Sequence, residues 1–213
     1  MKVVCLPGVG MSCNCYLART ENGGGWIVDP GDDPERILSA VKENDFSPQS
    51  VLLTHAHCDH IGAARAVCSA LAIPLWIGAG DAAFLTDADS NLSRRYGSVE
   101  IRNLHADRLL REGDVLSQGT ESLRVLETPG HTPGSLCFLG DGILFSGDTL
   151  FYESIGTMDF PGGDWNSMRS SIVKLQALPG DYVIYPGHGE STTMEHERNH
   201  NPYNGVLDRE FIF

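Results

Sequence analysis

The most informative stretch of the chain is His55-Ala56-His57-Cys58-Asp59-His60. It places three imidazoles and one carboxylate within six residues, directly after the apolar run Val51-Leu52-Leu53. Neutral imidazole and carboxylate are ligands that zinc, manganese and iron accept. The stretch therefore predicts a metal site in the turn that follows a buried strand.

Three later segments each place one polar side chain after a predicted strand or between two Pro-Gly pairs. They are Thr128-Pro129-Gly130-His131, Ser146-Gly147-Asp148 and Pro186-Gly187-His188. Taken singly, each is more typical of a hydrogen-bonded turn than of a metal ligand. Together with the first stretch, they favour one shared metal site, because loops at strand ends are where α/β scaffolds host chemistry. The three other histidines, His105, His196 and His200, have no such context, and we interpret them as surface or packing residues.

The composition of the chain is that of an ordinary soluble globular protein, with 213 residues that are 41% hydrophobic and 20% charged. We expect a single domain over residues 1–213. No run approaches the roughly 20 apolar residues that a membrane span needs, and the N-terminal segment does not resemble a signal peptide. These features predict a cytoplasmic protein that does not bind membranes.

The net charge of −13 weighs against nucleic-acid binding, since a surface that reads phosphates needs clustered lysine and arginine. The one basic pair, Arg94-Arg95, precedes Tyr96, and we interpret this cluster as a solvated loop in preference to an anion site. The six cysteines are expected to stay reduced. Cys58 is interpreted as a packing residue, because its neighbours on both sides are candidate metal ligands.

The order of predicted elements is that of an α/β protein. Strands are expected at 26–29, 51–54 and 74–77. A helix capped by Asp33 should run from Pro34 to about Asn44, and a second helix should span 61–72. A short helical piece is expected near 81–85, and residues 86–106 should form an irregular excursion over the site. The remaining expected elements are hairpin strands at 115–116, 123–126, 135–139 and 143–145, a helix capped by Asp164, a strand at 182–185 and a polar helix from about 192.

The motif order resembles that of the metallo-β-lactamase superfamily, whose first motif is matched by Asp29 in Val-Asp-Pro-Gly. The resemblance implies an αββα four-layer sandwich, with two mixed sheets covered by helices and a dinuclear metal site at one edge. Asp29 would orient a ligand histidine by a hydrogen bond. Carried over by motif, the ligands would be His55, His57 and His131 for one metal ion, Asp59, His60 and His188 for the other, and Asp148 as a bridge.

Within that superfamily the chain is most similar to small glyoxalase II-like (hydroxyacylglutathione hydrolase-like) hydrolases. The segments 128–135, 145–151, 159–164 and 201–203 carry this similarity. Full-length glyoxalase II has a C-terminal helical domain that supplies basic residues for glutathione, and this chain ends before such a domain. The group also usually has lysine or arginine in the segment 156–159, where this chain has Thr157. Both differences weigh against recognition of anionic glutathione.

The resemblance implies a metallo-hydrolase that acts on ester or thioester bonds of a small-molecule substrate. Two divalent metal ions, zinc in preference to iron or manganese, would lower the pKa of a shared water from about 15.7 to near 7. The resulting metal-bound hydroxide would attack the acyl carbonyl. Asp59 could also accept a proton, although we expect metal ligation to be its main role.

Three alternatives remain compatible with the sequence. Persulfide dioxygenases resemble it in motif order but use one iron, for which the ligands here would be His55, His131 and Asp148. A lactonase would share the same metal site. A non-catalytic metal-binding domain is the third alternative, because a fold alone does not determine function. No feature of the sequence specifies an oligomeric state.

Overall fold

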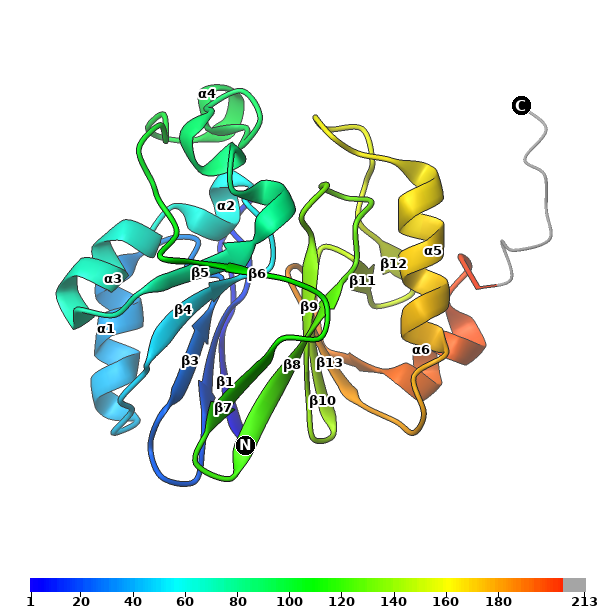
Figure 1. Ribbon diagram of the computed structural model, residues 1–213, viewed down its shortest axis with the longest axis horizontal. Helices are drawn as coiled ribbons and strands as arrows, with labels where there is room; N and C mark the ends of the chain where they lie inside the picture. Colours follow the sequence, from blue (N-terminus) through cyan, green and yellow to red (C-terminus); the bar gives the residue numbers. More distant parts are fainter. Residues whose placement is uncertain (205–213) are drawn as a thin grey trace.

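A computed structural model describes residues 1–204 of the chain, which form two facing six-stranded sheets with helices on their outer faces (Figure 1). Each sheet mixes parallel and antiparallel pairs. The first sheet has the order β1 (Lys2–Leu6), β2 (Cys15–Arg19), β3 (Gly25–Val28), β4 (Ser50–Leu53), β5 (Leu75–Gly78), β6 (Arg108–Leu110). The second has the order β14 (Thr192–Thr193), β13 (Val183–Pro186), β10 (Ile143–Gly147), β9 (Leu136–Gly140), β8 (Glu121–Glu127), β7 (Val115–Gln118).

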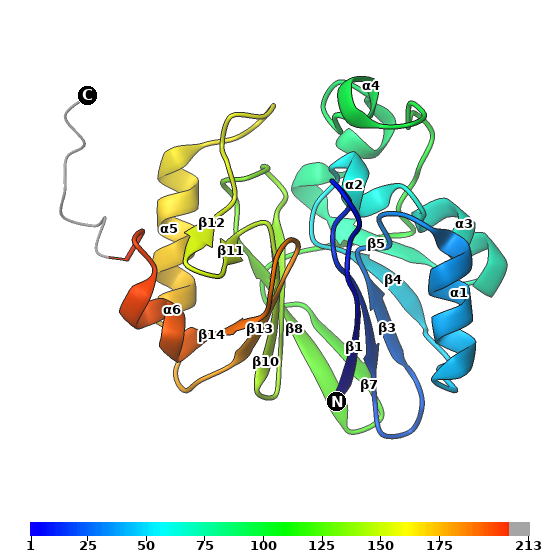
Figure 2. The same cartoon turned by 180° about the vertical axis from the view of Figure 1, so that it is seen from behind.

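Helices complete the four layers. The first sheet is covered by α1 (Pro34–Glu43) and α3 (Ala64–Leu71), and the second by α5 (Trp165–Gln176) and α6 (Met194–His200), as Figure 2 shows from behind. The expected αββα sandwich is therefore confirmed. The shorter elements are α2 (Cys58–Ile61), α4 (Ser93–Tyr96), the 3₁₀ turns Ala79–Asp81 and Phe84–Thr86, and the small hairpin of β11 (Leu150–Phe151) and β12 (Ser154–Ile155).

Alternation of side chains along the central strands fills three apolar layers. In β3, Trp26 and Val28 pack between the two sheets, whereas Ile27 packs beneath the helices of the first sheet. In β10, Phe145 lies between the sheets and Leu144 faces α5. Because both faces of these strands are buried, they read in the sequence as continuous apolar runs.

The first predicted helix is confirmed. Asp33 accepts a hydrogen bond from the Arg36 amide at 3.0 Å and caps α1, and Asn44 lies at its C-terminal end. Asp164 likewise caps α5 by accepting from the Ser167 amide at 2.7 Å. These short polar side chains satisfy amides that the first helical turn leaves without partners.

The predicted helix over 61–72 is present as α3, but it begins later than expected, because the structure has two short helices separated by Gly62 and Ala63. A Cβ atom at Gly62 would lie 2.4 Å from the Gly31 carbonyl oxygen, and the next amide, of Ala63, donates to the Pro30 carbonyl at 3.0 Å. The loop that follows β3 thus interrupts the helix by packing against it. The first of the two helices also begins inside the His55–His60 stretch, where the sequence predicted only a turn.

The remaining expectations hold with small shifts of boundary. The hairpins β7–β8 and β9–β10 are antiparallel, and 86–106 is irregular apart from α4 and the end of one 3₁₀ turn. All six cysteines are free thiols. Within the described part of the chain, no helix is both long enough and apolar enough to cross a bilayer.

Candidate metal centre

The predicted ligands come together at one end of the sandwich, where loops of both sheets meet (Figure 1). His55 and His57 follow β4, Asp59 and His60 lie in α2, and the other three follow β8, β10 and β13. Three overlapping groups could each hold a metal ion, with ligand atoms within 4.8 Å of one another: His55, His57 and His131; His55, His60 and Asp148; Asp59, His60 and His188.

The first group consists of three buried imidazoles. His57 Nδ1 lies 3.1 Å from His55 Nε2 and 2.9 Å from His131 Nε2. The rings meet edge to face, with an angle of 86° between the planes of His57 and His131. Nitrogen atoms from three rings therefore converge on one point, as three ligands of a tetrahedral zinc site do.

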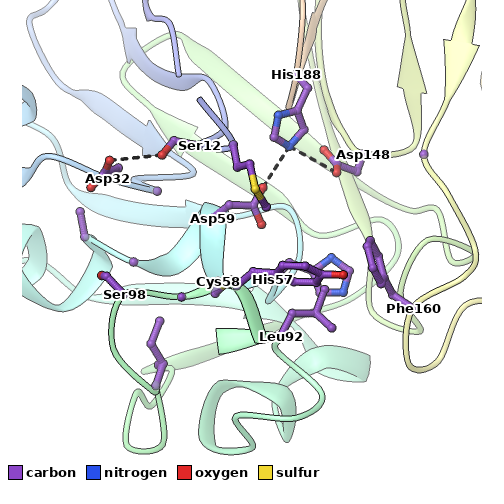
Figure 3. Close-up of a pocket in the computed structure, with 18 of the residues that line it drawn as sticks. Ser12, Asp32, His57, Cys58, Asp59, Leu92, Ser98, Asp148, Phe160 and His188 are labelled. Atoms are coloured by element: carbon purple, nitrogen blue, oxygen red, sulfur yellow. Dashed lines mark hydrogen bonds and ion pairs between the residues drawn. The ribbon is translucent and has the colours of Figure 1, made fainter. Parts of the chain in front are cut away.

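The group of Asp59, His60 and His188, called the second ligand group below, is more open, and Asp148 lies between it and the first group. His188 Nε2 lies 3.0 Å from Asp59 Oδ2 and 3.6 Å from Asp148 Oδ2 (Figure 3). The same Asp148 oxygen lies 3.5 Å from His131 Nε2 of the first group. One carboxylate thus reaches both groups, which is the placement that a bridging ligand requires.

Outer hydrogen bonds orient three of the imidazoles. Asp29 accepts from the Thr54 amide at 2.8 Å and the Thr54 hydroxyl at 2.6 Å, and its Oδ2 lies 2.9 Å from His60 Nδ1. The Thr54 hydroxyl also lies 3.1 Å from His55 Nδ1. On the other side, the Thr157 carbonyl lies 2.6 Å from His131 Nδ1. Carbonyl and carboxylate partners at Nδ1 leave Nε2 free for a metal ion.

A fully buried aspartate, Asp81, joins the loops that carry the first group. Its carboxylate accepts from the Ala56 amide at 3.0 Å, the Thr132 hydroxyl at 2.8 Å and the Gly134 amide at 2.6 Å. Ala56 lies between two candidate ligands and Thr132 follows a third. Burial raises the pKa of Asp81, although these hydrogen bonds oppose that shift. Asp81 fixes the spacing between the two loops.

The His188 loop is held by Asn14, which directly precedes β2 of the first sheet. The Asn14 amide donates to the Gly187 carbonyl at 2.7 Å, and its side chain donates to the carbonyls of Pro186 and Gly189. Gly187 is required here, since a Cβ atom at this position would lie 2.1 Å from Asp148 Oδ1. Sequence reasoning found Asp29 but missed Asn14, Asp81 and the partner role of Thr157, because their contacts are long-range and no local motif marks them.

Burial and charge set the protonation states of the cluster. Burial lowers the pKa of His57 to about 3 and that of His55 well below its usual value. Burial acts to raise the pKa of Asp148, but the surrounding imidazoles hold it below its ordinary range. Neutral imidazole and ionised carboxylate are the forms that bind metals.

His60 differs from the other imidazoles. Burial acts to lower its pKa, but the surrounding carboxylates of Asp148, Asp59 and Asp29 raise it well above the usual value. Metal binding at His60 would therefore displace a proton from this ring.

The cluster passes a test of fit for metal ions. Among the described residues, four buried side-chain atoms have no hydrogen-bond partner, and three of them are His57 Nε2, His60 Nε2 and Asp148 Oδ1. An unpaired buried polar atom costs about 1–3 kcal/mol. His60 Nε2 and Asp148 Oδ1, which lie 3.3 Å apart in the cluster, are explained if metal ions are their partners. In His57 the nitrogen that faces the first group is Nδ1, so its unpaired Nε2 is not explained in this way.

A cavity of about 730 Å³ opens onto the cluster (Figure 3). It exposes Asp59, His57 and His188 to a ligand, and Phe160 stands beside His57 with ring centroids 5.5 Å apart. The irregular segment 86–106 contributes Leu92 and the residues 96–99 to its wall, as the sequence predicted.

Cys58 lines the cavity, and it belongs to none of the groups that could hold a metal among residues 1–204. Burial raises the pKa of its thiol to about 11, so the thiol stays protonated. His105, His196 and His200 also lie outside these groups. His196 pairs with Glu153 at 3.0 Å and stacks on His200.

Comparison with known proteins identifies the family. The sequence pattern of the metallo-beta-lactamase superfamily matches residues 8–188, and the chain belongs to this superfamily. A curated relative, the hydroxyacylglutathione hydrolase GloC of Haemophilus influenzae, is 34% identical over 207 residues, which cover 95% of this chain and 98% of the relative.

Two solved structures share most of the fold. The crystal structure of the BLEG-1 B3 metallo-beta-lactamase has a TM-score of 0.90 and 36% identity, covering 96% of this chain and all of that one. The structure of TTHA1623 in a di-iron-bound form has a TM-score of 0.83 and 35% identity, covering 95% of this chain and all of that one. The similarity to glyoxalase II-like proteins expected from the sequence is confirmed, and the superfamily typically binds two metal ions.

Proposed function

We propose that the chain is a metal-dependent hydrolase that cleaves a thioester of a small-molecule substrate, as glyoxalase II-like enzymes do. The observation that carries the proposal is the position of Asp148, whose Oδ2 lies 3.5 Å from His131 and 3.6 Å from His188. A carboxylate between two ligand groups, at the floor of a cavity, supports a pair of metal ions that share one site. The similarity to a hydroxyacylglutathione hydrolase supports the reaction class.

In this proposal His55, His57 and His131 hold one metal ion, Asp59, His60 and His188 hold the other, and Asp148 bridges them. When bound, such a pair supplies an activated water at neutral pH and polarises an acyl carbonyl. We infer zinc as the metal, although a relative is known in a di-iron form.

Other residues of the chain orient these ligands, and one of the ligands can accept a proton. Asp29 and the Thr157 carbonyl hold His60 and His131 with Nε2 directed into the cluster. The Asp59 side chain is 26% exposed, and it faces the cavity where a substrate carbonyl would arrive. Its carboxylate can therefore accept a proton during attack on the carbonyl, besides binding metal.

The test removes one proposed ligand at a time, the bridging Asp148 or His57 of the first group. In Asp148→Ala and His57→Ala we expect loss of metal and a fall in thioester hydrolysis of about 10²-fold or more. His200→Ala is the matched control, since His200 is exposed and lies outside the cluster. Full metal content together with undiminished activity in either cluster variant would overturn the proposal.

A second candidate is hydrolysis of the cyclic amide of a β-lactam, which the similarity to BLEG-1 favours. The same ligand set would serve both reactions, so the assay decides between them. A panel with a thioester, a β-lactam and a lactone, run without oxygen, also separates these hydrolases from the dioxygenase alternative. Hydrolysis of the β-lactam alone would replace the thioester proposal.

A further inference from the structure

We infer that the cavity disfavours thioesters whose thiol part carries a negative charge, and that Asp32 sets this preference. The inference rests on the proposed hydrolase function and specifies its substrate class. It differs from what the name of the relative GloC describes, because a glutathione thioester is anionic.

Apolar side chains from three loops surround the cavity. Met11, between β1 and β2, is 67% exposed, and Val99, after α4, is 74% exposed. Tyr96 is 41% exposed and contacts the Phe160 ring, with centroids 6.1 Å apart. Leu92 and Phe160 are labelled beside His57 in Figure 3. When an apolar part of a substrate covers these side chains, they leave water, and the binding free energy becomes more favourable.

The charged side chains at the rim of the same cavity, away from the candidate ligands, are acidic. Bound metal ions would offset the charges of Asp59 and Asp148, so the charge at the rim comes from Asp32 and Asp33. None of the described residues that line the cavity is lysine or arginine. Asp33 is engaged as the cap of α1. Asp32 accepts from the Ser12 hydroxyl at 3.2 Å and from the Asp33 amide at 2.8 Å, and it is exposed at the rim, where its carboxylate faces an incoming ligand (Figure 3).

The arginines of the neighbouring helices α1 and α4 have other partners. Arg36 donates to the Pro7 carbonyl at 2.9 Å. Arg94 pairs with Asp89 at 2.6 Å and with Glu100 at 3.3 Å.

Arg95 stacks over the Tyr96 ring, with its guanidinium carbon 5.0 Å from the ring centroid. The cation–π contact offsets part of the cost of keeping this side chain in place. Among the described residues that line the cavity, no lysine or arginine is positioned to form an ion pair with a substrate carboxylate.

The experiment compares three thioesters with one butyryl group and different thiols. They are S-butyryl-N-acetylcysteine, which is anionic, S-butyryl-N-acetylcysteamine, which lacks only that carboxylate, and butyrylthiocholine, which is cationic. With the metal-loaded enzyme we expect kcat/KM to be about three- to tenfold higher for the neutral and cationic compounds than for the anion, mainly through KM. Binding of the matching thioethers by calorimetry should show the same order.

Asp32→Asn should reduce the ratio of neutral to anionic kcat/KM toward one, whereas Glu35→Gln, an exposed acid outside the cavity, should leave that ratio unchanged. A preference for the anion in the wild type would overturn the inference. If the wild type prefers the anionic thioester and Arg95→Gln loses that preference, Arg95 is the residue that binds the anion. If none of the three thioesters is cleaved and the panel above is also inert, the proposed function itself fails.

Discussion

Replacing Asp81 with asparagine tests whether the first ligand group depends on a buried carboxylate. Asp81 Oδ1 accepts from the Gly134 amide, and Oδ2 accepts from the Ala56 amide and the Thr132 hydroxyl. Asparagine keeps one oxygen, so whichever way it turns, one backbone N–H faces an NH₂ group. The Thr132 hydroxyl can rotate to accept, since it also contacts Ser135 Oγ at 2.7 Å. One buried amide is left without a partner.

One such loss costs about 2 kcal/mol, and for a chain of this length we expect Tm to fall by about 4–8 °C. The loops that carry His57 and His131 also lose their common anchor, so metal affinity should fall by about 10- to 100-fold. Calorimetric unfolding and a metal titration measure the two effects. Asp141→Asn, in the exposed β9–β10 turn, removes the same charge and serves as control. An Asp81→Asn protein with unchanged Tm and metal affinity would refute this role.

Three further changes have defined outcomes. Gly62→Ala brings a Cβ atom to 2.4 Å from the Gly31 carbonyl, so it should destabilise the fold by about 1–3 kcal/mol in urea unfolding; an unchanged midpoint would contradict this packing. Asp33→Ala removes the cap of α1 and should cost about 1 kcal/mol by the same assay, and no loss would mean that the cap is replaced. A chelator should lower Tm, because metal in 100-fold excess over its Kd contributes about 2.7 kcal/mol; a Tm that ignores the chelator would count against a metal-binding cluster.

The sequence predicted the parts of the site that lie in local motifs. His55 to His60 are close along the chain, and His131, Asp148 and His188 each stand beside glycine in a loop, so residue type and spacing marked them. The central strands were predictable for a similar reason, since both of their faces are buried.

Long-range contacts account for what the sequence did not predict. The helix break at Gly62 depends on the loop at Gly31, which is distant in the sequence. Asp81 and Asn14 act on loops far from their own positions, through backbone amides and carbonyls that no residue pattern encodes. The apolar rim of the cavity comes from irregular segments, where no periodicity indicates which side chains face inward.

Metal content per chain tests the central claim most directly. The protein is loaded with zinc, freed of excess metal and analysed by mass spectrometry, in parallel with His188→Ala, which removes one member of the second ligand group. We expect two metal ions per chain in the wild type, about one in the variant, and oxygen-independent cleavage of a thioester only with both. One zinc ion per chain in both proteins, or turnover that requires iron and consumes oxygen, would contradict the account.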